Sequence, residues 1–167
     1  MRHLSPRPAH PGRAPQRGLT LIELMVALTI AALLALAAAP NLGDYIANSR
    51  LREGSHLLLT ETLAAQSEAV KRNAVVRLST SGSQIQVIDR TVPGSPVTLR
   101  TRQVSGGVSY DTISIDFDSQ GRVTPLADQT VDVSANGVLC SSELRCPRLR
   151  VDGGGGVRLC GDRLNCS

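Results

Sequence analysis

Four cysteines near the C-terminus are the residues with the clearest capacity for chemistry. They are Cys140, Cys146, Cys160 and Cys166, and five residues separate the members of the first pair and of the last pair. Thiolates can hold zinc, but structural zinc sites usually separate paired ligands by two to four residues. The spacing, with no histidine nearby, therefore favours disulfide bonds over a metal, provided that this region folds in an oxidising compartment.

The pairing of these cysteines depends on the chain that joins them. Residues 148–159, RLRVDGGGGVRL, predict a β-hairpin around a glycine-rich turn. Opposed residues in an antiparallel pair have a constant index sum, so a hairpin centred on Gly153 would place Cys146 opposite Cys160 and Cys140 opposite Cys166. Four cysteines allow three pairings, and we favour this nested one. Local pairing, Cys140 with Cys146 and Cys160 with Cys166, stays open.

A single carboxylate, Glu23, lies in an otherwise apolar stretch of 21 residues, Leu19–Ala39, LTLIELMVALTIAALLALAAA. A helix of that length spans roughly 31 Å, which matches the hydrocarbon core of a bilayer. A carboxylate at that depth is costly and needs a partner. Basic residues before an apolar span hold that end in the cytoplasm, so the residues after Ala39 are expected to be exported.

The net charge supports this orientation. The chain carries 18 Lys and Arg against 14 Asp and Glu, a net charge of +4. The whole excess lies in residues 1–18, which contain no acidic residue and carry Arg2, Arg7, Arg13 and Arg17. Residues 19–167 are therefore neutral, and the excess indicates membrane orientation rather than nucleic-acid binding. Only three aromatic residues occur, which argues against a single-strand binder built on base stacking.

Three interpretations compete for the N-terminal region. A secretory signal peptide would be cut after Ala39, but Pro40 follows that bond and Glu23 interrupts the apolar stretch. A plain membrane anchor explains the length but not the carboxylate. The third interpretation is a prepilin leader followed by a pilin helix, and it also accounts for Glu23. The segment RGLTLIEL at 17–24 resembles the prepilin peptidase site of type IV pilins and type II secretion pseudopilins.

This resemblance implies cleavage between Gly18 and Leu19 and methylation of the new terminus, Leu19, where phenylalanine is the commonest residue in the family. Glu23 would then lie beside the terminal amine of a neighbouring subunit during assembly. Pro40 becomes residue 22 of the mature chain, where many pilins carry a helix-bending proline. The implied partners are prepilin peptidase, other major and minor pilins or pseudopilins, and the inner-membrane assembly platform. The implied location is a single pass through the inner membrane with a periplasmic head, and the filament tip after assembly.

One long helix is predicted over about residues 19–73. Its transmembrane half is 19–39, and its amphipathic half, 40–73, is expected to pack on a head domain. Leu59, Leu63 and Val70 are predicted to form the buried face. Residues expected to point away are Arg52, Glu61, Glu68 and Arg72. Gly43 and Gly54 are expected to be weak points in the helix, and His56 a surface or packing residue.

Residues 74–167 are predicted to form a small β-rich head built as two sheets, with a helix over one face. The expected strands before the C-terminal hairpin are Val75–Leu78, Gln84–Asp89, Val97–Val104, Thr112–Phe117 and Val131–Val133. With one phenylalanine and no tryptophan, the core must consist of Val, Leu and Ile, so a covalent staple is valuable. The predicted fold class is therefore α+β and pilin-like.

No catalytic constellation is found in the sequence, and we expect no enzyme activity, cofactor or metal. Asp116–Gly121, DFDSQG, faintly resembles a calcium loop, but the twelfth position is Ala127, where a bidentate Glu is needed. A strand that ends in a glycine turn explains the segment better.

The head most resembles the GspH/FimT group of minor pilins and pseudopilins, through ISIDFDSQGR at 113–122 and GVRLC at 156–160. The resemblance implies a low-abundance subunit at or near the tip of a type II secretion pseudopilus or a type IV pilus. Some members bind DNA through a Gly-Arg-x-Arg turn, which here is Gly155–Arg158, GGVR, without the first arginine. The candidate DNA contacts are Arg145, Arg148, Arg150, Arg158 and Arg163.

Overall fold

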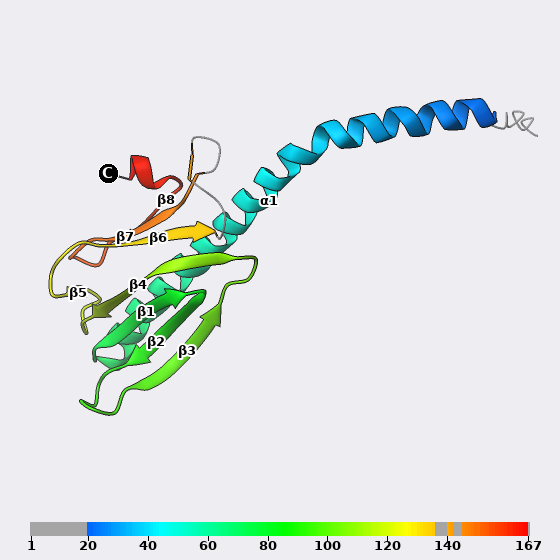
Figure 1. Ribbon diagram of the computed structural model, residues 1–167. Coiled ribbons are helices and arrows are strands. Elements are labelled where there is room, and N and C mark those ends of the chain that lie inside the picture. The colour runs from blue at the N-terminus through cyan, green and yellow to red at the C-terminus, as the bar shows by residue number, and fades with distance from the viewer. Residues whose placement is uncertain (1–19, 136–139, 142–144, 167) are drawn as a thin grey trace, which may run out of the picture. The chain divides into compact units, whose positions relative to one another are not determined.

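The computed structural model describes residues 20–135, 140–141 and 145–166 (Figure 1). The chain forms two compact units, Met1–Ala39 and Pro40–Ser167. The described part of the first unit is helical from Leu21, and its large apolar side chains are exposed. By length and composition, no single described helix qualifies as a membrane span, whereas Leu21–Ala37 and Leu42–Arg72 qualify when taken together as a broken span.

Helix α1 (Leu21–Arg72) ends in the second unit, close to the predicted position. Asn73 adopts a left-handed conformation with φ of 50°, as a residue that terminates a helix commonly does. The amide of Asn73 donates to the carbonyl of Val70, and that of Ala74 donates to Ala69, so these carbonyls have partners at the helix end.

Eight strands follow α1, and all neighbouring strands are antiparallel. They are β1 (Val76–Gly82), β2 (Gln84–Asp89), β3 (Val97–Gln103), β4 (Val108–Phe117), β5 (Val123–Thr124), β6 (Gln129–Ala135), β7 (Arg148–Val151) and β8 (Val157–Cys160). The hydrogen-bonded order is β3-β2-β1-β4-β6-β7-β8, and β5 adds to β4. The strands expected from the sequence are all present.

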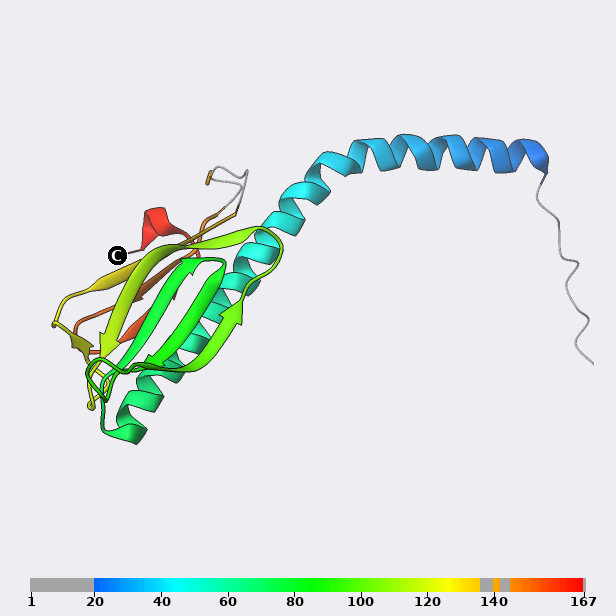
Figure 2. The same ribbon diagram turned by 60° about the horizontal axis from the view of Figure 1, so that its bottom comes forward.

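The two expected sheets are present but joined: β1–β5 belong to one, β7 and β8 to the other, and β6 pairs with both, which makes one continuous hydrogen-bonded path. The link in that path is narrow: β4 and β6 pair only at Val108–Tyr110 with Val133–Ala135. Beyond these three residue pairs β6 pairs with β7, so the β3-β2-β1-β4 part and the β6-β7-β8 part diverge on either side of α1 (Figures 1 and 2).

The core lies between α1 and the strands. On α1 the fully buried apolar side chains are Leu51, Leu58, Ala65 and Ala69, which recur at intervals of seven and four residues and therefore share one face. On the strands alternate side chains are buried, as the two-residue period of a β-strand requires. These include Val76, Leu78, Ile85, Val87, Ile115, Phe117, Val131, Val133, Leu149 and Val151.

The predicted buried face of the helix is wrong. Leu63 and Val70 are 47% and 52% exposed, and Leu59 is only partly buried. Glu61, which was expected to point away, is 3% exposed. Leu51 and Leu58 do face the sheet, but at several other contact positions small residues allow a close approach, while Leu59, Leu63 and Val70 lie on the flank. These small residues are Gly54, Ser55, Ala65 and Ala69.

The disulfides also differ from the nested arrangement that we favoured. Cys140 pairs with Cys146 and Cys160 with Cys166, each with a Cα–Cα distance of 5.5 Å. In the β7–β8 hairpin, Arg148 lies opposite Cys160, so the turn is centred on Gly154 rather than Gly153. Cys146 precedes β7 and is two residues out of register with Cys160, which leaves each cysteine to pair within its own short loop.

Candidate functional site

The first turn of α1 carries the residues for which an assembly role was predicted. The amide of Glu23 donates to the hydroxyl of Thr20 at 3.3 Å, so Thr20 caps the helix. Glu23 lies in the first turn, where a carboxylate is stabilised by the helix dipole. Gly18 and Leu19 lie outside the described residues, as does the rest of segment 1–18. Pro40 lies at the boundary between the two units, and its predicted helix-bending role stays a prediction.

Gly54 is a contact point rather than a weak point in the helix. A Cβ at this position would lie 2.7 Å from Cγ1 of Val108, so only glycine lets α1 come this close to β4. The Gly54 carbonyl also accepts a hydrogen bond of 2.9 Å from the Tyr110 hydroxyl. Burial raises the pKa of Tyr110 to about 12, so this hydroxyl stays protonated and keeps donating at physiological pH.

Glu61 joins α1 to β3, the edge strand of the sheet. Its carboxylate lies 3.2 Å from Nε of Arg102 and 3.5 Å from a guanidinium nitrogen of Arg100. The carboxylate is almost completely buried, whereas both arginines are largely exposed. A buried carboxylate requires such counter-charges, so this pair of arginines holds the edge strand against the helix.

Gln66 connects the two glycine turns that suggested the family resemblance. Its Nε2 atom donates to the carbonyl of Gly121 at 2.7 Å and to that of Gly155 at 2.8 Å. Both glycines have positive φ, and a Cβ on Gly155 would lie 2.2 Å from the Gly121 carbonyl oxygen. The turns after β4 and β7 therefore meet at one helix side chain. The sequence analysis missed Gln66, because its partners lie 55 and 89 residues away.

The segment that resembled a calcium loop is a self-contained turn. One carboxylate oxygen of Asp118 accepts hydrogen bonds from the amides of Gln120 and Arg122, and the other accepts from the Arg122 side chain. These bonds hold the pKa of Asp118 below its usual range, the Arg122 amide being the main cause. Within the described residues no group of three or more metal-ligating side chains is found.

The five candidate DNA contacts do not form one free cationic surface. The Arg148 guanidinium makes a two-pronged ion pair with Asp132, and that of Arg150 lies 2.8 Å from Asp128. Arg163 also approaches Asp132, at 3.8 Å. The bond to Arg148 is the main cause that lowers the pKa of Asp132. Arg158 on β8 lies opposite Arg150, whereas Arg145 lies on another surface, next to α1.

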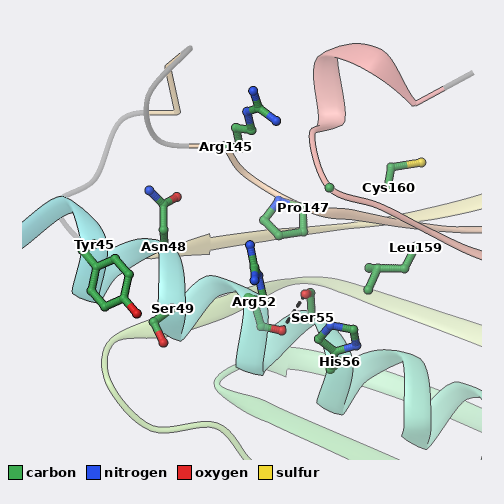
Figure 3. A pocket seen from close by; sticks show the side chains of 11 residues that line it. Tyr45, Asn48, Ser49, Arg52, Ser55, His56, Arg145, Pro147, Leu159 and Cys160 are labelled. Atoms are coloured by element: carbon green, nitrogen blue, oxygen red, sulfur yellow. Dashed lines mark hydrogen bonds between the residues drawn. The ribbon is translucent and has the colours of Figure 1, made fainter.

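That surface is a groove of about 610 Å³ between α1 and the segments around the two disulfides (Figure 3). The helix contributes Tyr45, Asn48, Ser49, Arg52, Ser55 and His56. The opposite wall consists of Arg145, Pro147, Leu159, Cys160 and Gly161.

Two family models match this chain. The prokaryotic N-terminal methylation motif matches residues 13–39. The type II transport protein GspH matches residues 55–155, which is more than half of the chain. The chain belongs to the GspH family. The matched range includes Gln66 and both glycines that it bridges, and the family resemblance expected from the sequence is confirmed. Members of this family are minor pilins or pseudopilins, so this chain is a minor pilin-like subunit, and its family is anchored in the membrane through the N-terminal helix.

Solved structures show the same fold at low sequence identity. The type IV minor pilin FimU of Pseudomonas aeruginosa has a TM-score of 0.56 and 17% identity, and the match covers 66% of this chain and 88% of that one. Escherichia coli GspH has a TM-score of 0.55 and 14% identity over 72% and 94% of the two chains. The minor pseudopilin EpsH of the Vibrio cholerae type 2 secretion system has a TM-score of 0.54 and 13% identity over 66% and 96%. These matches confirm the pilin-like α+β fold. A comparison with curated sequences finds no matching protein.

Proposed function

We propose that this GspH-family protein is a precursor that prepilin peptidase cleaves between Gly18 and Leu19, with methylation of Leu19. Segment 19–39 then anchors it in the inner membrane, with the N-terminus cytoplasmic and the head, residues 74–167, periplasmic. Through the inner-membrane assembly platform it joins other major and minor pilins or pseudopilins at or near the filament tip, where it primes assembly. Its contribution is structural rather than enzymatic.

One observation carries this proposal: the methylation motif at 13–39 precedes the GspH match at 55–155 in the same chain. Cleavage site, apolar helix and head therefore occur in the order that filament assembly requires. The large apolar side chains on residues 21–36 are exposed, and they need lipid or neighbouring helices to cover them.

The processing step is tested by co-expression with and without prepilin peptidase, followed by intact-mass and N-terminal analysis. We expect a mature chain that begins at methylated Leu19 only when the peptidase is present. A chain that begins at Pro40 would instead identify a soluble exported protein with an ordinary signal peptide, and would overturn the proposal.

Assembly is tested with Glu23→Ala. We expect normal cleavage but loss of the protein from sheared filaments, because the terminal amine of the neighbouring subunit loses its counter-charge. Thr29→Ala, which changes a polar residue one to two turns further along α1, serves as the matched control and should assemble normally. Deletion of the gene distinguishes the two machines: loss of protein secretion indicates a pseudopilus, and loss of surface motility indicates a pilus.

DNA binding during uptake is the alternative function. Arg148 and Arg150 already pair with aspartates, so phosphates would have to displace Asp132 and Asp128. We therefore expect the purified protein to give no mobility shift with duplex DNA, even at low ionic strength. A salt-sensitive shift that Arg148→Ala and Arg158→Ala each weaken would establish the alternative.

A further inference from the structure

The groove between α1 and the disulfide loops has an unusual charge arrangement. Arg52 on the helix and Arg145 on the opposite wall both line it, together with His56 (Figure 3). Among the lining residues that the structure describes, none is acidic. The groove therefore gathers basic groups from two parts of the chain more than 90 residues apart, and its described lining supplies no carboxylate to neutralise them.

Elsewhere in the head, the described arginines have partners. Most described arginines bind a carboxylate, as Arg77 does with Asp116 and Arg148 with Asp132. Arg50, two residues before Arg52, donates to the Gly106 carbonyl at 3.4 Å. Among the described arginines, only Arg52 and Arg145 have guanidinium groups that make neither a hydrogen bond nor an ion pair with another described residue. Both of these groups line the same groove.

The wall that carries Arg145 is fixed by covalent and hydrogen bonds. Arg145 precedes Cys146, which is 1% exposed and bonded to Cys140. Cys160 lines the groove and is bonded to Cys166. The amide of Arg163 donates to the Cys146 carbonyl at 2.8 Å and so joins the two disulfide loops. These bonds tie the backbone next to Arg145 to the C-terminal loop, which lowers the ordering cost of binding at this wall.

We propose that this groove binds an acidic polypeptide segment of a neighbouring subunit, whose carboxylates pair with Arg52 and Arg145. The fork of a guanidinium matches a carboxylate in two-pronged geometry. The volume of about 610 Å³, and the apolar surfaces of Tyr45, Pro147 and Leu159, suit a stretch of side chains better than a lone inorganic anion. The inference rests on the proposed function, because only a filament subunit is surrounded by such neighbours.

Binding is tested first with the full mature chain in detergent micelles, titrated with hexaglutamate at low ionic strength. We expect saturable binding that Arg52→Gln and Arg145→Gln each weaken about fivefold. Arg50→Gln removes the same charge from the same helix outside the groove, and should leave the affinity unchanged. Inorganic phosphate and phosphatidylglycerol vesicles are titrated in parallel. Equal or tighter binding of either at these arginines, or an equal effect of Arg50→Gln, would overturn the proposal.

The occupant is identified in assembled filaments with a photo-crosslinking residue at Ser49, which lines the groove and is exposed. We expect mass spectrometry to find an acidic segment of another pilin-like subunit. Arg52→Glu should abolish that crosslink, and replacing the partner's acidic residue by arginine should restore it. Crosslinks only to lipid or to segments without acidic residues would contradict the inference.

The same strains separate this inference from the proposed function. If Arg52→Glu and Arg145→Glu enter filaments at the wild-type level and keep the wild-type crosslink, the groove proposal fails while the filament role stands. If the wild-type chain itself is not cleaved after Gly18 and does not enter filaments, the proposed function fails.

Discussion

Two stretches of the same helix meet very different surroundings. Between Leu21 and Leu36 the large apolar side chains are exposed, and no residue in the described part of the chain covers them. Between Leu51 and Ala69 the helix buries one face against the strands, largely through small side chains. The first stretch depends on lipid or other subunits, whereas the second is stabilised by its own head. Stability and assembly should therefore be separable by mutation along one helix.

The largest difference in the free energy of unfolding of the head is expected between the variants Leu58→Ala and Leu28→Ala. Leu58 is completely buried and Leu28 is 61% exposed. Loss of a buried leucine should lower the free energy of unfolding of the head by about 2–5 kcal/mol, and Leu28→Ala should leave it unchanged. Hydrogen exchange of the amides in β1 and β4 measures this difference. Equal destabilisation by both substitutions would show that the two stretches do not differ in the way described.

A smaller effect is expected at Gln66, which bonds the second stretch to the two glycine turns. Gln66→Leu removes the donor for the Gly121 and Gly155 carbonyls and should cost about 1–3 kcal/mol, because both lose a partner. Gln120→Leu, at an exposed position in one of these turns, is the matched control. Thermal unfolding checks the difference, and exchange should increase first in the two turns. A melting temperature that is the same in both variants would show that Gln66 does not hold the turns together.

The sequence predicted well those features that depend on local pattern. The helix, the alternating strands and the N-terminal methylation motif all follow from residues close together in the chain. The features that depend on close packing between α1 and the strands were predicted poorly. Gly54 resembles a helix breaker until Val108 and Tyr110 are seen beside it. The buried face was misassigned because hydropathy favours Leu63 over Ala65, although the smaller side chain is the one that fits against the sheet.

The disulfide pairing was predicted wrongly, and the groove was not predicted, for a related reason. A turn centred one residue later moves Cys146 two residues out of register with Cys160, and a run of four glycines does not specify its own centre. The sequence analysis grouped five C-terminal arginines as candidate DNA contacts because they lie close together along the chain. In the structure, aspartates that precede β7 by 16 or more residues neutralise Arg148 and Arg150, and Arg145 joins Arg52 from the helix. Only the fold reveals which cations have partners.

The smallest expected effect concerns pH, and it again distinguishes the head from the first stretch of helix. Arg148 holds the pKa of Asp132 below its usual range. The folded state therefore binds this proton less tightly than the unfolded state, so the ion pair stabilises the head above about pH 4. This contribution is lost as the pH falls through the lowered pKa of Asp132.

Asp132→Asn should cost roughly 1 kcal/mol at neutral pH and progressively less in acid. Asp44→Asn, at an exposed position on α1, is the control and should leave the stability of the head at neutral pH unchanged. Unfolding of the full chain in micelles, followed from pH 7 to pH 2, should show the sheet weakening in acid while the helical signal of residues 21–39 persists. If that signal were lost together with the sheet, the two stretches of α1 would be one cooperative unit, and the contrast between them would be wrong.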